Sequence, residues 1–137
     1  MTLHVEVVSP ERILWTGEAD MVTARTVGGG DIAFLTGHAP FVGALDIGKV
    51  MIRPADGADE LVAVHGGFVE VSNNRVTILS DVAEVASQID IARAQAAAER
   101  AEAALRAETD VEAEAALRRA HVRIAVAGGQ PAATSGH

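Results

Sequence analysis

The amino-acid usage changes abruptly about two-thirds of the way along the chain. Residues 1 to about 85 hold most of the Val, Ile, Phe and Gly, whereas residues 87–127 are dominated by Ala, Glu and Arg and contain neither Gly nor Pro. The first composition is typical of strands joined by turns, and the second is typical of helices. The change predicts two domains, at 1–86 and 87–127, and the Gly-containing end at 128–137 predicts a disordered tail.

Short apolar stretches separated by turn residues recur through the first domain. Leu3–Val7 alternates apolar and polar residues, as a half-buried strand does. Asn73-Asn74 tolerates positive φ and predicts a hairpin turn. The other expected strands are Met21–Thr26, Ile32–Leu35, Phe41–Leu45, Lys49–Arg53, Leu61–Val64, Phe68–Val71 and Arg75–Leu79. Many short strands with regular turn signals favour an antiparallel β-sandwich or flattened barrel.

Apolar residues in the second domain step by three and four, which is the pattern of one helical stripe. The first stripe comprises Ile91, Ala94, Ala98, Ala101 and Leu105; the second comprises Ala113, Leu117, Ala120, Ile124 and Ala127. Asp90, or Ser87 with Asp90 at its third position, is expected to cap the first helix, and Thr109 with Glu112 has the form of a capping box. The prediction is an α+β protein with a C-terminal antiparallel two-helix hairpin.

Alanine dominates both helical stripes, and this has an energetic consequence. Alanine has high helix propensity, but its burial removes little apolar surface from water. The hairpin is therefore expected to be helical yet weakly held against the sandwich. Such a hairpin could detach without unfolding.

Charge and composition disfavour several classes of protein. The net charge of −8 opposes nucleic-acid binding and electrostatic adhesion to anionic lipid. The absence of Cys excludes disulfides, thiol catalysis and Cys-ligated zinc. No apolar run approaches the length of a membrane-spanning helix, and the N-terminus lacks a signal-peptide pattern, so we expect a soluble chain without direct membrane insertion.

No residue pattern indicates an enzyme active site or a metal site. The histidines show no metal-ligand spacing, so each is interpreted as structural or exposed; His38, in a compact Gly-His-Ala-Pro loop, is the least ordinary of them. No Ser lies in a nucleophile elbow. The five histidines are His4, His38, His65, His121 and His137.

Arginines on the two helices could meet in the hairpin. Arg93 and Arg100 share one face of the first helix, and Arg119 and Arg123 share one face of the second. Guanidinium groups match phosphate oxygens, so an antiparallel hairpin could gather them against a polyanion. The alternative interpretation is a solvated face of Glu–Arg pairs, such as Glu114–Arg118.

Three segments together resemble a known family. Residues 30–40 read GDIAFLTGHAP and resemble the GELGILPGHAP segment of the ε subunit of bacterial F-type ATP synthase. Residues 66–71 and 76–79 resemble the closing strands of that family, and residues 89–94 read IDIARA, which fits its I/L-D-x-x-R-A motif. The chain departs from the pattern at Asp31, Ala33 and Thr36, where the family has Glu, Gly and Pro. The resemblance covers residues 2–127.

The resemblance implies a non-catalytic rotor subunit of the central stalk, which couples transmembrane proton flow to ATP synthesis. Its sandwich would bind the γ subunit and the c-ring, with the loop around Asp31 and His38 at that interface. Its hairpin would lie against the sandwich or extend into the α/β catalytic head and block ATP hydrolysis. The implied location is the cytoplasmic face of the bacterial cell membrane, held there through the complex.

The family also implies a regulatory ligand. In some bacterial members ATP bound to the compact hairpin favours the non-inhibitory form. For this chain we expect no required cofactor and ATP as a regulatory ligand. The matching positions here are Glu84, Ile89, Asp90, Arg93, Ala94, Arg100, Arg119 and Arg123. Two other hypotheses stay open: an adaptor whose hairpin binds protein in another complex, and, less favoured, a small hydrolase.

Overall fold

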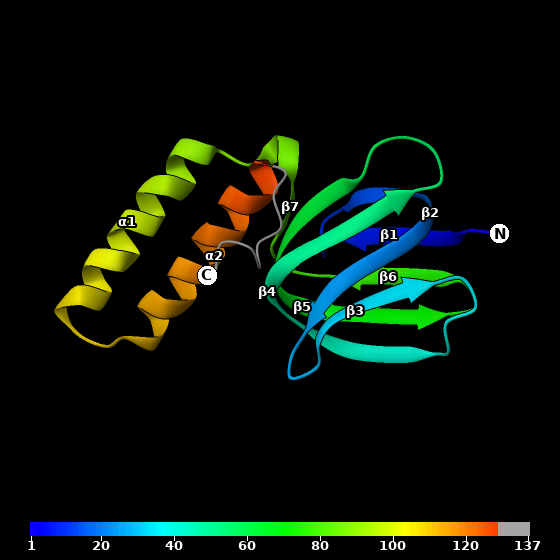
Figure 1. Ribbon diagram of the computed structural model, residues 1–137, viewed down its shortest axis with the longest axis horizontal. Coiled ribbons are helices and arrows are strands. Elements are labelled where there is room, and N and C mark those ends of the chain that lie inside the picture. Colours follow the sequence, from blue (N-terminus) through cyan, green and yellow to red (C-terminus); the bar gives the residue numbers. More distant parts are fainter. Residues whose placement is uncertain (129–137) are drawn as a thin grey trace.

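The structure, a computed structural model, describes residues 1–128 and shows a β-domain followed by two helices (Figure 1). The predicted tail therefore lies, apart from Gly128, outside the described residues. The elements in order are β1 (Leu3–Val8), β2 (Ile13–Thr26), β3 (Gly30–Leu35), β4 (Phe41–Pro54), β5 (Glu60–Ser72), β6 (Arg75–Leu79), β7 (Ala83–Val85), the 3₁₀ turn η1 (Ala86–Gln88), α1 (Ile91–Ala107) and α2 (Val111–Ala127).

The strands close into a flattened barrel. The hydrogen-bonded order is β1-β6-β5-β4-β2-β3. β1 also pairs with β2, so the five strands from β1 to β2 in this order form a closed ring. β3 extends this ring at β2, and β7 pairs with β5. The predicted fold class is confirmed, with one difference: β1 and β6 run parallel, whereas the other pairs are antiparallel.

Long bent strands replace several of the short strands that the sequence predicts. β5 joins the two predicted stretches Leu61–Val64 and Phe68–Val71, and β4 joins another two. β5 bends at Gly66-Gly67, where φ is +91° and +123°, while its register against β4 stays the same on both sides of the bend. A Cβ at Gly67 would collide with the Leu79 carbonyl oxygen of β6. The two glycines let β5 bend from one layer of the sandwich into the other without breaking its pairing with β4.

Alternating side chains of the strands fill the sandwich. Leu3, Val5 and Val7 of β1 all point inward, as the alternation predicts, and Phe34 of β3 is the largest fully buried side chain. The turn between β5 and β6 contains Asn73 and Asn74 at positive φ, also as predicted. This core is a cluster separate from the one beneath the helices.

Aspartate residues cap both helices. The Asp90 side chain accepts a hydrogen bond from Arg93 N, so Asp90 rather than Ser87 begins α1. The Asp110 side chain accepts from Glu112 N and begins α2. The prediction that Thr109 caps the second helix is wrong by one residue, because the carboxylate of Asp110 already accepts the first free amide groups of that helix.

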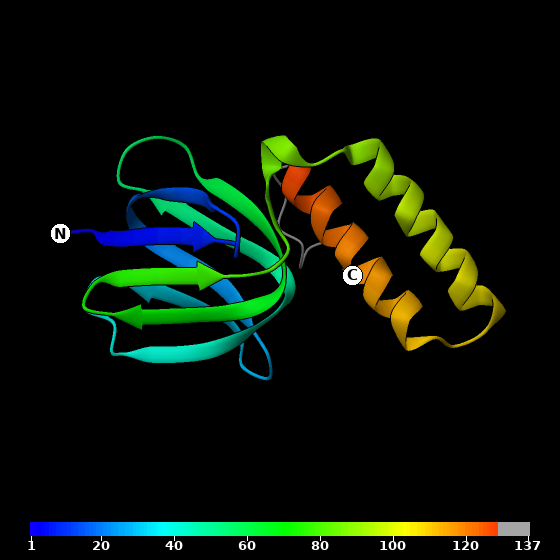
Figure 2. The same ribbon diagram turned by 180° about the vertical axis from the view of Figure 1, so that it is seen from behind.

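Helix α2 lies between α1 and the sandwich, and α1 packs against α2 on the outer side (Figures 1 and 2). The predicted stripe of α1 is buried at three alanines, but Ile91 is exposed. α2 has a second buried face, formed by Val122 and Val126, that the single stripe did not predict. This face packs on Ala63 of β5, together with Ile47, Leu61, Ala86 and Ile89. We call these seven residues the docking cluster.

The structure also bears on membrane crossing. Over residues 1–128, neither helix combines the length and the apolar character that a membrane span requires.

Candidate functional site

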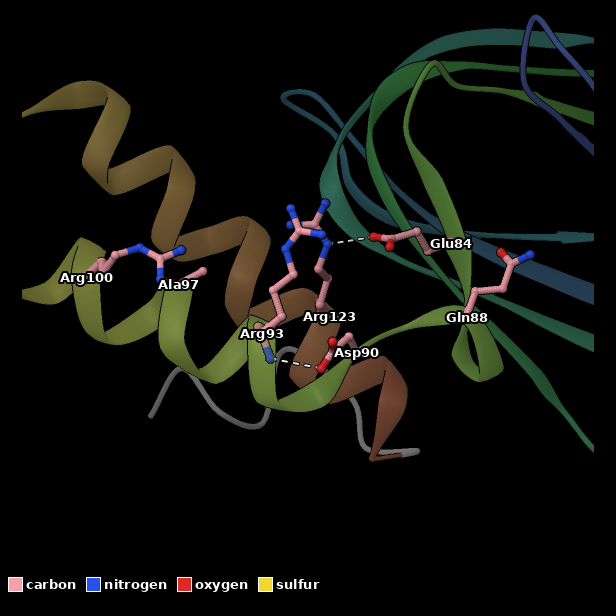
Figure 3. A pocket seen from close by; sticks show the side chains of 8 residues that line it. Glu84, Gln88, Asp90, Arg93, Ala97, Arg100 and Arg123 are labelled. Atoms are coloured by element: carbon pink, nitrogen blue, oxygen red, sulfur yellow. Dashed lines mark hydrogen bonds and ion pairs between the residues drawn. The ribbon is translucent and has the colours of Figure 1, made fainter.

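A cavity of about 310 Å³ lies where the hairpin meets the sandwich (Figure 3). Its wall includes residues from four elements, so it exists only while the hairpin is docked. The lining residues are Glu84 of β7, Gln88 of η1, the cap residue Asp90, Arg93, Ala94, Ala97 and Arg100 of α1, and Arg123 of α2. The volume is in the range of small-molecule sites.

Arg123 and Glu84 form the ion pair that joins α2 to the sandwich at this cavity. Arg123 Nε donates to Glu84 Oε1 at 2.6 Å, and both side chains are about 30% exposed (28% and 30%). β7 positions Glu84 through its pairing with β5, where Glu84 lies opposite Ala63. The contact is a short charge-assisted hydrogen bond between the two domains.

Two guanidinium groups of α1 face the same cavity, and neither has a carboxylate partner in the part of the chain that the structure describes. Arg93 and Arg100 are seven residues apart, so both project from one face of the helix toward the cavity (Figure 3). Within residues 1–128, no ion pair is found for either side chain. With Arg123, the wall carries three arginines against two carboxylates, which favours an anionic ligand.

Asp90 shapes the end of the cavity beside the start of α1. One of its carboxylate oxygens accepts the backbone N–H of Arg93 at 3.0 Å. Helix α1 therefore begins at the wall, where its amino end favours negative charge. A carboxylate near this wall can also accept hydrogen bonds from an amino group or a hydroxyl group of a ligand.

Two of the predicted site residues lie away from the cavity wall. Arg119 donates to Glu112 at 2.7 Å, and Ile89 packs in the docking cluster. The structure thus gathers three of the four predicted arginines. The predicted pair Glu114–Arg118 is also replaced, since Arg118 contacts Asp46 of β4 at 3.4 Å.

The cavity wall includes two residues that the sequence analysis missed. Ala97 lies one helical turn from Arg93 and one from Arg100, so helical spacing alone would have found it. Gln88 lies in η1, where its side-chain oxygen accepts from Val85 N. No sequence signal marked Gln88, because its position depends on how η1 joins the strand to the helix.

The segment around Asp31 and His38 is a strand followed by a loop. Asp31 is in β3 and pairs with Arg25 of β2, with 3.2 Å between Nε and Oδ1. His38 follows β3, and its Nδ1 donates to the Ala39 carbonyl oxygen at 2.7 Å. The His38 ring lies edge-on to Phe34, with 5.0 Å between ring centroids. The whole strand separates the two residues, so the structure does not bring Asp31 and His38 together.

The loop with His38 lies at the end of the sandwich away from the hairpin (Figures 1 and 2). Gly37 N donates to the Asn74 side chain at 2.7 Å, which fixes this loop to the turn between β5 and β6. The loop is therefore held in a defined position at one end of the molecule, and the cavity lies at the other.

The outer face of β4, β5 and β6 carries exposed apolar side chains. Val42, Phe68 and Leu79 are 69%, 58% and 45% exposed. Phe68 pairs directly with Leu79, and Val42 is diagonal to Phe68 in the register of β4 and β5. We call these three residues the outer apolar patch. Contiguous exposed apolar side chains often mark a protein-binding surface.

Fold and cavity define a two-domain protein in which a closed β-sandwich carries a helical hairpin over an arginine-lined site. The beta-sandwich domain of the ATP synthase delta/epsilon chain matches residues 2–86, and the long alpha-helix domain of the same chain matches residues 87–128. The chain belongs to the ATP synthase delta/epsilon chain family, and the resemblance to the bacterial ε subunit is confirmed.

Bacterial relatives support this assignment over most of the chain. The ATP synthase epsilon chain of Streptomyces avermitilis is 46% identical over 122 residues, covering 89% of this chain and 92% of that protein. The epsilon chain of Symbiobacterium thermophilum is 48% identical over 131 residues, covering 92% and 93%.

Solved structures share the fold at lower sequence identity. A chain in the Euglena gracilis mitochondrial ATP synthase structure, described as OSCP/F1/c-ring, aligns with a TM-score of 0.69 and 21% identity, covering 99% of this chain and 82% of that one. A chain from the central stalk and c-ring of the Tetrahymena thermophila enzyme aligns with a TM-score of 0.53 and 18% identity, covering 64% and 69%.

Proposed function

We propose that this protein is a non-catalytic rotor subunit of a bacterial ATP synthase, whose hairpin regulates ATP hydrolysis in response to nucleotide. The family assignment supports the role in the complex. The observation that carries the regulatory role is the cavity, because three arginines from the two helices line it. Rotor function here would couple proton flow to ATP synthesis at the cytoplasmic face of the membrane, with the subunit attached through its partners.

The outer apolar patch is the proposed contact with the γ subunit. Val42, Phe68 and Leu79 present apolar surface on the sandwich and leave the helices free. Burying side chains of this size against a partner gives about 1.5–3 kcal/mol each when burial is complete. The patch therefore suits a stable attachment through the sandwich.

The loop with His38 is the proposed contact with the c-ring. It lies at the end of the sandwich opposite the hairpin, and its bond to Asn74 holds it in place. An attachment at this end leaves the hairpin pointing away from the ring, toward the α/β catalytic head. Asp31, near the other end of β3, would then contribute on the γ side of the interface.

The cavity is the proposed site for ATP. Arg93, Arg100 and Arg123 would hold the phosphate groups, because guanidinium groups form paired hydrogen bonds with phosphate oxygens. Glu84 and Asp90 would accept hydrogen bonds from hydroxyl or amino groups of the nucleoside, and Ala94 leaves room beside them. The residues fit a nucleotide, since both the charge and the volume of the site match one.

ATP would act on the hairpin by population shift. The cavity requires α1, α2 and β7 together, so a ligand in it binds only the docked arrangement. A ligand moves an equilibrium only by its differential affinity for the two states. Bound ATP would therefore hold the hairpin against the sandwich, and its loss would release α1 and α2 to extend into the catalytic head and slow hydrolysis.

ATP hydrolysis by the assembled complex tests this function. The complex is rebuilt with the parent chain, with Arg100→Gln, or with Arg106→Gln, which removes the same charge from α1 outside the cavity wall. We expect Arg100→Gln to lower hydrolysis at millimolar ATP, because the hairpin is extended more of the time, and Arg106→Gln to behave as the parent. Equal hydrolysis by all three complexes would contradict the regulatory role. Failure of the parent chain to join γ and the c-ring would contradict the rotor role and favour the adaptor hypothesis.

A further inference from the structure

One buried side chain in the interface between hairpin and sandwich is ionisable. Side chains along β5 alternate, so Val62 and Val64 enter the sandwich core while Ala63 and His65 point to the other face. α2 covers that face through the docking cluster. The His65 side chain is 2% exposed, and separating α2 from the sandwich would open it to water.

The His65 ring has no hydrogen-bond partner among residues 1–128 at either nitrogen. Its Nε2 lies 3.6 Å from Glu84 Oε1, which is beyond hydrogen-bond distance. That oxygen instead accepts from Arg123 Nε at 2.6 Å. The carboxylate that could stabilise a protonated imidazole is thus already engaged by an arginine.

The charged groups that face His65 come from two elements. β7 contributes Glu84, and α2 contributes Arg123 and Arg119. On β4, where Ile47 pairs with His65, the neighbouring Asp46 is engaged by Arg118. Arg123 already engages Glu84, and Arg119 is paired with Glu112. A protonated His65 would therefore be an added cation without a free carboxylate beside it, in a position removed from water.

Burial, and next the positive charge of Arg123, lower the pKa of His65 to about 4, while Glu84 opposes the shift. An exposed histidine has a pKa of about 6.5. The docked arrangement therefore binds a proton at His65 much less readily than the separated arrangement does.

We propose that His65 makes docking of the hairpin depend on pH, because the docked arrangement requires the neutral imidazole and protonation favours separation of α2 from β5. The hairpin would thus respond to acidification through a residue outside the cavity wall. This pH response needs no nucleotide, so the experiment that tests it is independent of the proposed ATP site.

The size of the effect follows from proton linkage. Because the pKa of His65 is lowered in the docked state, docking is strongest above about pH 6.5, weakens as the pH falls, and levels off below about pH 4. Between pH 7.5 and pH 5.5, the docking equilibrium constant is expected to fall about tenfold. A change of this size would alter the hairpin population whenever docking is near balance.

Thiol protection measures the separated population directly, because the chain has no Cys. Ala63→Cys places a single thiol under α2 in the docking cluster, where a dithiodipyridine reagent reaches it only after separation. Ala55→Cys, at an exposed turn position, gives the intrinsic reactivity of a thiol at each pH. Val69→Cys, in the sandwich core, reports opening of the sandwich itself.

The labelling rate of Ala63→Cys, divided by that of Ala55→Cys, is expected to rise about tenfold from pH 7.5 to pH 5.5 without nucleotide. The same ratio for Val69→Cys should stay constant. Adding His65→Gln should abolish the rise, and adding His121→Gln, at an exposed position of α2, should leave it intact.

Three results would overturn the proposal. They are a constant ratio for Ala63→Cys, an equal rise for Val69→Cys, or a rise that persists in His65→Gln. The first two need no change at His65, so they decide the matter even where that variant folds poorly. His65→Leu is the second replacement, and it must give the same flat profile.

Discussion

Truncating Val126 should weaken docking of the hairpin while leaving the stability of the sandwich unchanged. Val126 is fully buried in the docking cluster, whereas the sandwich core is a different cluster. Val126→Ala removes two methyl groups from the interface, at about 0.8 kcal/mol for each buried carbon plus a smaller term for the cavity left behind. The expected cost is about 2 kcal/mol, which lowers the docking equilibrium constant about 30-fold.

Amide hydrogen exchange followed by mass spectrometry shows which helices and strands this loss of free energy destabilises. Most of the stability of a helix in a protein comes from packing of its apolar face, so α1 and α2 should exchange faster once they separate from the sandwich, even where they remain helical. We expect Val126→Ala to speed exchange in both helices by up to about 30-fold at neutral pH. Exchange in β1 and β6 should not change.

Two variants with the same chemical change serve as controls. Val111→Ala alters a residue of α2 that is 81% exposed, so helix exchange should stay at the parent rate. Val69→Ala truncates a fully buried residue of the sandwich core, so exchange in the strands should rise. Unchanged helix exchange in Val126→Ala would refute the reasoning. Equal acceleration in β1 and β6 would also refute it, because hairpin and sandwich would then open as one unit.

Three further variants test local features of the fold. In thermal denaturation, the melting temperature of Gly67→Ala should lie well below that of Gly57→Ala. Both positions have positive φ, but only a Cβ at Gly67 meets the Leu79 carbonyl oxygen. Equal melting temperatures of the two variants would contradict the clash. Asp110→Ala should cost about 1 kcal/mol in urea denaturation because α2 loses its cap, and a cost near zero would contradict that role. Arg118→Ala should change the free energy of unfolding by less than about 1 kcal/mol, because its contact with a carboxylate of β4 is solvent-exposed; a larger loss would show that ion pairs, more than apolar burial, hold the hairpin.

The sequence predicted the two domains because each has a strong local signature. Alternation in Leu3–Val7 and the three-four spacing of the alanines in α1 each correspond to buried faces in the structure. Gly66-Gly67 marked a break between predicted strands, yet the structure has one bent strand there. Local pattern cannot distinguish a turn from a bend, since the difference depends on which strands pair on either side.

The site was predicted less completely than the fold. Helical spacing brought Arg93 and Arg100 to one face, and the cavity uses both. Arg119 has the same kind of spacing relative to Arg123 but pairs with Glu112 of its own helix and does not line the cavity. His65 was interpreted as an ordinary residue, and its importance depends on the second buried face of α2, which one apolar stripe could not reveal.

Calorimetric titration of ATP into the full-length chain tests the central claim, that docking of the hairpin builds a nucleotide site. We predict saturable binding of one ATP by the parent and by Arg106→Gln, and binding at least tenfold weaker for Arg93→Gln and for Arg123→Gln, since each loses a charge-assisted phosphate contact of about 1.5–3 kcal/mol. No binding by the parent at millimolar ATP, or equal affinity for all four chains, would contradict it.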